Sequence, residues 1–116
     1  MARGHSRETT FQQNLVEQRQ VEYAVRELLT QVLEDVSADG RPIVGLGLKV
    51  RYAPFLTRNF TKKIPATLDR DAVRAGVMEL ANRIEPDRPV RLLGVRAEMA
   101  MPDDAREGHS PTRSGW

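Results

Sequence analysis

One stretch of sequence decides the fold: residues 43–52, which read IVGLGLKVRY. From Val44 to Arg51, four apolar residues at every second position alternate with two glycines and two basic residues. This is the period of a β-strand with one buried face. An Ala-Pro-Phe turn follows, and the β-forming residues of 56–64 predict a second strand. The two strands are expected to form an antiparallel hairpin.

A long amphipathic helix is expected before the hairpin. Apolar residues over 16–37 recur at helical spacing along one stripe. Gly40 is expected to end this helix in the left-handed conformation, which glycine adopts without strain. The short, threonine-rich segment 6–11 precedes the helix and suits a strand.

A second helix and a last strand are expected after the hairpin. Asp69 is predicted to cap the helix, with Leu68 and Val73 packed together as a hydrophobic staple. The proline at the end of the apolar stripe is expected to stop the helix. The last strand covers 90–99, VRLLGVRAEM, and Gly94 within it predicts a β-bulge.

The resulting order, β-α-β-β-α-β, predicts an α+β domain. Two helices with a single apolar stripe each need one shared surface, and a four-stranded sheet with one covered face supplies it. The predicted architecture is a two-layer sandwich over residues 5–101, with both helices on one face of the sheet. The other face stays open to solvent or to a partner. Residues 1–4 are expected to be the remnant of a tether, and the polar residues 102–116 a disordered tail.

Composition excludes several classes of protein. A length of 116 residues corresponds to about one domain. The absence of cysteine excludes a disulfide framework, a thiolate zinc site and a cysteine nucleophile. No carboxylates converge from the predicted rigid elements, so no catalytic or metal site is predicted. No apolar run is long enough to form a signal core or to span a membrane, which predicts a cytoplasmic protein without a membrane partner.

The basic residues are concentrated in the hairpin. The net charge is only +2, yet residues 40–66 contain six basic side chains and no acidic one. Cations, hydroxyls and an amide on an open sheet face suit phosphate oxygens, and Gly45 and Gly47 are expected to let a polymer approach the backbone closely. A solvated sheet edge whose lysines deter aggregation has the same composition, so the residues alone leave these two interpretations at even odds.

Several segments in register resemble the little finger (polymerase-associated) domain of Y-family DNA polymerases. The sequence ETTF at 8–11 is similar to that domain's opening, and GRP at 40–42 followed by LKVRYAPF at 48–55 is similar to its hairpin. The sequence RLLGVR at 91–96 resembles its closing strand. The resemblance covers about residues 5–101 and is greatest to the bacterial DNA polymerase IV type.

The resemblance implies sequence-independent binding of duplex DNA, with the open sheet in the major groove of the primer–template and in contact with phosphates of both strands. The implied partners are the palm, fingers and thumb of a translesion DNA polymerase. The catalytic carboxylates and their Mg²⁺ belong to the palm in this family, so this chain alone is expected to hold no cofactor and to be inactive as a polymerase. A monomer is expected. A sliding clamp is kept as a candidate partner, although the tail contains no clamp-binding peptide typical of the family.

The candidate DNA contacts follow from the parity of the hairpin and from the resemblance. They are Lys49, Arg51, Thr57, Arg58, Asn59, Thr61, Lys62 and Lys63, with Arg7, Thr9 and Arg96 on the flanking strands as secondary candidates. Arg58 and Lys62 share the parity of apolar residues, so either they lie at the sheet edge or the register slips by one residue. Two alternative functions stay open: a ferredoxin-like RNA-binding sheet, which the scarcity of aromatic residues disfavours, and a protein-interaction module that pairs through the hairpin edge.

Overall fold

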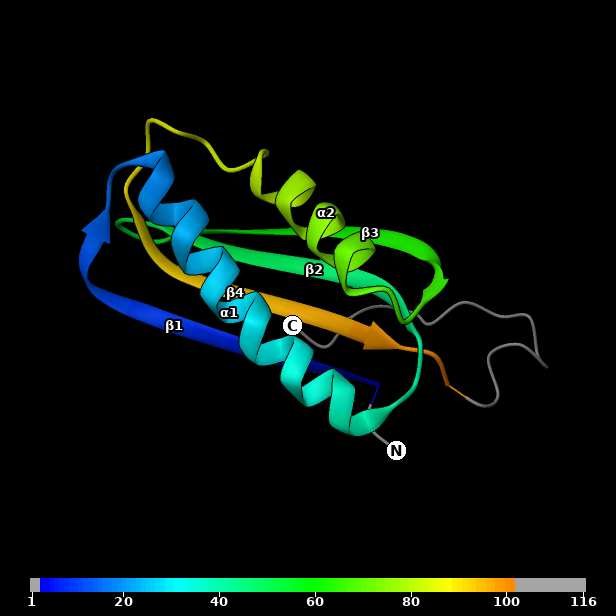
Figure 1. Cartoon of the computed structure of the whole chain (residues 1–116). Helices are drawn as coiled ribbons and strands as arrows, with labels where there is room; N and C mark the ends of the chain where they lie inside the picture. Colours follow the sequence, from blue (N-terminus) through cyan, green and yellow to red (C-terminus); the bar gives the residue numbers. More distant parts are fainter. Residues whose placement is uncertain (1–2, 102–116) are drawn as a thin grey trace.

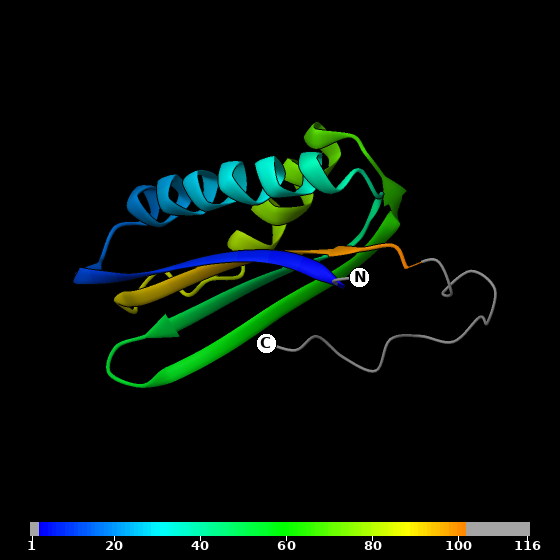
Figure 2. The same cartoon turned by 90° about the horizontal axis from the view of Figure 1, so that it is seen from below.

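The computed structural model describes residues 3–101, which form one sheet and two helices (Figure 1). In chain order the elements are β1 (Gly4–Leu15), α1 (Gln18–Asp39), β2 (Ile43–Tyr52), β3 (Leu56–Thr67), α2 (Arg70–Ala81) and β4 (Val90–Met99). Both helices cover the same face of the sheet (Figure 2). The predicted α+β two-layer architecture is therefore confirmed, while the expected tail at 102–116 lies outside the described residues.

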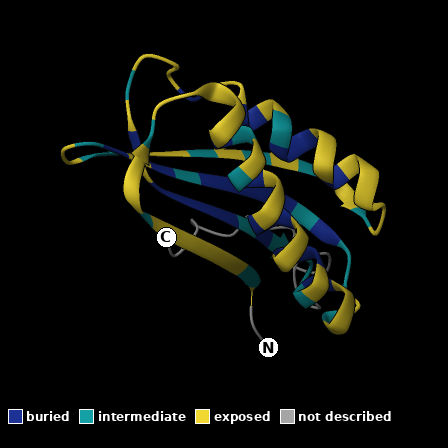
Figure 3. Ribbon diagram, turned by 60° about the vertical axis from the view of Figure 1, so that its left-hand side comes forward, coloured by how far each residue is buried: buried dark blue, intermediate teal, exposed yellow. Residues whose placement is uncertain are grey.

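The strands lie side by side in the order β1-β4-β2-β3, and every neighbouring pair is antiparallel. The expected hairpin is present as β2 and β3. The last strand, β4, lies between β1 and β2 and is buried along most of its length, whereas the edge strand β1 is mostly exposed (Figure 3). Residues on both faces of β1 are exposed, which agrees with its lack of the apolar alternation of β2.

Helix α1 forms as predicted. Its buried side chains are Val21, Val25, Leu28, Leu29, Val32, Leu33 and Val36. A capping box of Glu17 and Gln20 satisfies backbone N–H groups at its start. At its end Gly40 adopts the left-handed conformation, with φ of 85°, and donates its N–H to the carbonyl oxygen of Val36. The sequence therefore set both the buried stripe and the end of this helix.

Helix α2 is capped as predicted but differs in two details. The Asp69 side chain accepts a hydrogen bond of 2.9 Å from the backbone N–H of Asp71. The expected staple is wrong, because Leu68 is 66% exposed and therefore does not pack with Val73 in the core. The helix ends at Ala81, earlier than the proline that was expected to stop it. The residues after Ala81 form a turn, which still buries the last apolar residue of the stripe.

The β-bulge of β4 lies at Arg91, so its prediction at Gly94 is wrong. Arg51 lies opposite Leu92 and the next residue, Tyr52, lies opposite Val90, so Arg91 is the extra residue. Gly94 is paired regularly with both neighbouring strands.

Polar contacts fasten the two ends of the sheet. At one end the hydroxyl of the fully buried Tyr52 accepts a hydrogen bond of 2.9 Å from the backbone N–H of Glu85. At the other end Arg41 binds both oxygens of Asp39 at 2.7 Å, and His5 lies 2.8 Å from the same carboxylate. The Arg41 guanidinium, with His5, holds the pKa of Asp39 well below its usual range. These contacts join the ends of α1, β1 and β2.

Candidate nucleic-acid interface

The register of the sheet brings six of the predicted contacts onto one face. Arg51 lies opposite Thr57, Lys49 opposite Asn59, and the two remaining residues, Thr61 and Lys63, lie opposite Gly47 and Gly45. The intervening residues of β2, such as Leu48, are buried beneath the helices. Because successive side chains of a strand point to opposite faces, these six residues lie on the face that the helices leave open. We call this surface the open face, and the opposite surface the covered face.

Arg96 adds a further cation to the open face. It lies on β4 between Ser6 of β1 and Gly47 of β2, in the same row as Thr61. Its Nε atom is buried and makes no hydrogen bond within residues 3–101. A buried N–H group without an acceptor is unfavourable, so Arg96 gains from any anion that its guanidinium can reach.

The register also answers the question about Arg58 and Lys62. They lie opposite Val50 and Leu46, on the covered face of the edge strand β3, so the predicted register holds without a slip. The ammonium of Lys62 donates a hydrogen bond of 2.7 Å to Glu79 of α2, and this lowers the pKa of the Glu79 carboxyl. The structure does not bring these two basic residues to the open face.

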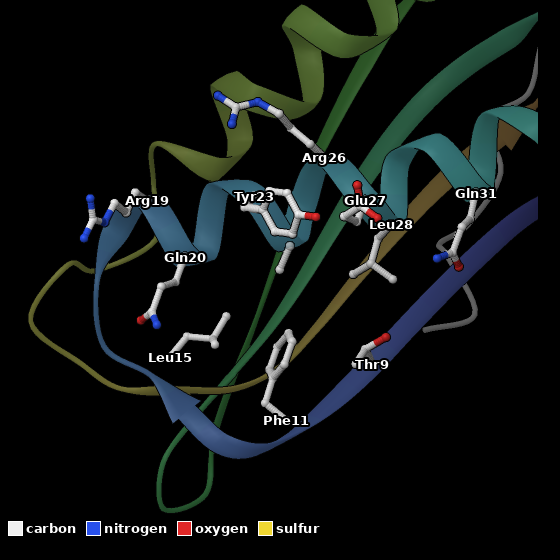
Figure 4. Close-up of a pocket in the computed structure, with 11 residues that line it drawn as sticks. Thr9, Phe11, Leu15, Arg19, Gln20, Tyr23, Arg26, Glu27, Leu28 and Gln31 are labelled. Atoms are coloured by element: carbon white, nitrogen blue, oxygen red, sulfur yellow. The ribbon is translucent and has the colours of Figure 1, made fainter.

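The secondary candidates Arg7 and Thr9 lie on the covered face as well. Arg7 donates two hydrogen bonds of 2.9 Å to Asp35 of α1, and its guanidinium lowers the pKa of that carboxyl. Thr9 lies under α1, on the wall of a groove that Figure 4 draws. Of the three secondary candidates, therefore, the open face contains Arg96 alone.

That groove lies between β1 and the first half of α1 and has a volume of about 690 Å³. In Figure 4 the side chains of Phe11 and Leu15 rise from β1 toward Tyr23 and Leu28 of α1. Tyr23 is 64% exposed, so the groove is open to solvent on the helix side. It is separate from the open face.

Two carboxylates that the hairpin sequence does not reveal share the open face. Glu8 of β1 lies 3.6 Å from the ammonium of Lys49, and Glu98 of β4 lies beside Gly45. A Cβ atom built on Gly45 would be 3.3 Å from the Glu98 carboxylate, so this side chain fills the space that was expected to admit a polymer. The hairpin has no acidic residue of its own, but its neighbours in space supply them. Strand parity alone could not reveal this, because it does not say which strand lies beside which.

Residues 3–101 offer no other chemistry at this surface. Within that range no three His, Cys, Asp or Glu side chains gather to hold a metal ion. Neither helix of the described part has the length and apolar character needed to cross a bilayer. The open face therefore presents cations, hydroxyls and one amide, which are groups that can contact phosphate oxygens, together with the carboxylates of Glu8 and Glu98.

Comparison with known protein families shows the family to which the chain belongs. The model of the impB/mucB/samB family C-terminal domain matches residues 2–110. The chain belongs to this family. It is the little finger domain of Y-family DNA polymerases, as the motifs of its β1, hairpin and β4 indicate.

Curated relatives of this little finger domain are polymerases of the DNA polymerase IV type. DNA polymerase IV 2 of Mycobacterium tuberculosis is 38% identical over 99 residues, which are 84% of this chain and 29% of that polymerase. DNA polymerase IV of Methanoculleus marisnigri is 33% identical over 95 residues, which are 81% of this chain and 26% of that polymerase. The chain thus spans less than a third of these relatives.

Solved structures share the fold of this little finger domain. The complex of the beta-clamp processivity factor and the little finger domain of PolIV superposes with a TM-score of 0.70 at 16% identity, covering 97% of this chain and 99% of that chain. A Y-family DNA polymerase chimera superposes with a TM-score of 0.72 at 14% identity, covering 84% of this chain and 28% of that chain. At such identities the superpositions establish the fold.

Proposed function

We propose that this little finger domain binds duplex DNA without sequence preference, as part of a translesion DNA polymerase. One observation carries the proposal: the register of β2 and β3 gathers Lys49, Arg51 and Lys63 with two hydroxyls and an amide on the face that no helix covers. In the row that contains Thr61, Arg96 has a buried Nε atom that finds no acceptor within residues 3–101. These side chains are those that grip phosphates, while base edges are read by groups that enter the grooves.

The binding site that we propose is flat and electrostatic, and this fixes its behaviour. The open sheet is proposed to lie in the major groove of the primer–template and to contact phosphates of both strands. Such contacts release counterions from the DNA, so each neutralised phosphate contributes about 0.9 to the slope of log affinity against log salt. Sequence-independent binding of this kind has dissociation constants on the order of 10⁻⁴–10⁻⁶ M at physiological salt.

The catalytic context is proposed from the relatives. The curated relatives are named DNA polymerase IV, and the chain corresponds to less than a third of each. We propose that a palm domain with Mg²⁺ carries out nucleotide transfer, and that this domain, as a monomer, holds the duplex product. Both domains are proposed to act in the cytoplasm, and DNA repair is proposed to depend on both. A sliding clamp is a further candidate partner, because one solved structure with this fold is a complex of a beta-clamp with a little finger domain, and the superposition covers 97% of this chain.

RNA binding is the less favoured alternative. Domains that read single-stranded RNA from a sheet stack bases on aromatic side chains. In the paired rows of the described sheet the open face carries none: Phe60 lies opposite Leu48 on the covered face, and Phe11 lines the groove under α1. A protein partner would instead bind in that groove or at the sheet edges. Mapping the contact surface therefore distinguishes a protein partner from a nucleic acid on the open face.

The test measures fluorescence anisotropy of a labelled primer–template duplex titrated with the 116-residue chain over a series of salt concentrations. We expect salt-dependent binding that a Lys49→Ala/Arg51→Ala/Lys63→Ala triple variant reduces, with a slope smaller by about 2–3. A single-stranded RNA of equal length, used as competitor, is expected to compete poorly.

The matched control removes the same charge from the helical layer. An Arg26→Ala/Arg74→Ala/Arg83→Ala variant changes exposed cations of α1, α2 and the turn after α2. It is expected to bind DNA like the original chain. Two results would overturn the proposal: an equal loss of affinity for the duplex in the two triple variants, or binding by the original chain that does not depend on salt concentration.

A further inference from the structure

Glu8 and Lys49 meet across a strand that neither belongs to. Glu8 is in β1, Lys49 is in β2, and β4 runs between them with Gly94 in the same row. Adjacent strands are about 4.8 Å apart, so the two backbones are separated by roughly 10 Å. The carboxylate and the ammonium nevertheless approach to 3.6 Å. Gly94 has no side chain, so no side chain of β4 separates the two groups in this row.

The ion pair holds Lys49 down on the sheet. The Lys49 side chain is only 21% exposed, although it lies on the open face, and Glu8 is 47% exposed. The next basic residue of β2, Arg51, is exposed and has a hydroxyl, Thr57, as its neighbour instead of a carboxylate. Among the cations of the open face in residues 3–101, Lys49 is the one with a carboxylate partner.

We propose that Glu8 competes with DNA phosphate for Lys49 and thereby sets the affinity of the open face. This inference rests on the proposed function. A carboxylate oxygen and a phosphate oxygen take the same ammonium, so DNA either displaces Glu8 or approaches a face whose charge Glu8 partly cancels. Both cases cost affinity and reduce the number of counterions that binding releases. Glu8 is not itself a DNA contact in this proposal, because it acts on DNA binding through Lys49.

The decisive variant is Glu8→Gln, which keeps the shape of the side chain and removes its charge. We expect it to bind the primer–template duplex about two- to fivefold more tightly near 0.1 M salt, the range that corresponds to an exposed ion pair. The salt slope is expected to become steeper by up to about 0.9, since Lys49 then counts fully. The inference is supported if the variant binds more tightly than the original chain and its far-UV circular dichroism spectrum is unchanged.

A double-mutant cycle separates competition from general repulsion. If Glu8 acts through Lys49, the gain from Glu8→Gln shrinks in a Lys49→Met background. An equal gain in both backgrounds would overturn the inference, because it would mean that Glu8 repels DNA without reference to Lys49. Weaker binding by Glu8→Gln would also overturn it, because the carboxylate would then orient the lysine for DNA.

Glu79→Gln is the matched control. It too removes one carboxylate from a lysine pair, the pair with Lys62, but on the covered face. We expect its affinity and salt slope for duplex DNA to equal those of the original chain. A gain equal to that of Glu8→Gln would overturn the inference, since net charge alone would then explain both.

The same measurements distinguish the inference from the function on which it rests. If the Lys49, Arg51 and Lys63 triple variant loses binding while Glu8→Gln changes nothing, the proposed function stands and the competition fails. If the original chain shows no salt-dependent binding to duplex DNA, the proposed function fails first and the inference fails with it.

Discussion

The two faces of the sheet contain similar basic residues in different surroundings. On the covered face Arg7 and Lys62 are each held by a helix carboxylate, at 2.9 and 2.7 Å. On the open face, in residues 3–101, Arg51 and Lys63 have no carboxylate within ion-pair distance, and Lys49 has Glu8 at 3.6 Å. Helix carboxylates therefore neutralise Arg7 and Lys62 on the covered face, whereas Arg51 and Lys63 on the open face have no such partner within residues 3–101. The number of cations along the hairpin does not distinguish the two faces of the sheet. The difference lies in whether a carboxylate of a neighbouring element neutralises each cation.

The largest difference between the faces is expected in stability, from two adjacent residues of β2. Leu48 is fully buried on the covered face, so Leu48→Ala is expected to lower the free energy of unfolding by about 2–5 kcal/mol. Lys49→Met on the open face removes one exposed ion pair and is expected to cost no more than about 1 kcal/mol. Urea unfolding followed by circular dichroism measures both. Equal costs would show that the open face also forms part of the core.

The next test uses two adjacent lysines of β3. Lys63 is on the open face and Lys62 on the covered face, where Glu79 neutralises it. Lys63→Gln is expected to weaken duplex binding and to reduce the salt slope by about 0.9. Lys62→Gln is expected to leave both unchanged, as measured by the same anisotropy titration. The reverse ranking would mean that DNA approaches from the helix side.

A smaller effect is expected where the covered face meets the turn after α2. The buried Tyr52 hydroxyl accepts the backbone N–H of Glu85, so Tyr52→Phe is expected to lower the free energy of unfolding by about 1 kcal/mol. Tyr23 is 64% exposed, and Tyr23→Phe is expected to change stability by less than about 0.5 kcal/mol. Thermal or urea unfolding compares the two phenol deletions directly. A loss from Tyr23→Phe as large as that from Tyr52→Phe would contradict the burial difference.

The smallest effect concerns acid pH. The Arg7 guanidinium and the Lys62 ammonium lower the pKa values of Asp35 and Glu79 in the folded chain. A lowered carboxyl pKa means that the folded state binds fewer protons, so the stabilisation is complete above about pH 4 and is lost as the pH falls through the folded pKa. An Asp35→Asn/Glu79→Gln variant is therefore expected to lose less stability than the original chain between neutral pH and about pH 3. Parallel urea unfolding curves at the two pH values give the difference. An equal loss of stability at acid pH in both proteins would mean that groups other than Asp35 and Glu79 cause the acid sensitivity.

Much of the fold was predictable because it depends on local geometry. The alternation in β2, the stripe of α1, the glycine that ends α1 and the Asp69 cap each follow from neighbouring residues. Two predictions were wrong. Leu68 is 66% exposed and does not form the staple with Val73, and the bulge lies at Arg91 because the pairing of β4 with β2 decides where the extra residue goes.

The candidate site was predictable in part, for the same reason. The parity of the hairpin placed Lys49, Arg51, Asn59 and Lys63 on one face, and the register confirms this. It could not show that Arg7 and Lys62 bind helix carboxylates, because those partners lie far along the chain. Both residues were candidates because of their charge and the family resemblance, and the structure places them on the covered face.

The sequence by itself determined the elements of this domain, their order and the two sides of its hairpin, since a period of two or 3.6 residues is a local property. Tertiary structure alone decided that β4 lies between β1 and β2. That placement brings Glu8 over Gly94 to Lys49, puts Arg96 on the open face and sets the helices against Arg7 and Lys62. Strands distant in the chain are paired by the packing of the whole core, so the charge of the open face is a property of the fold, and net charge or charge runs do not reveal it.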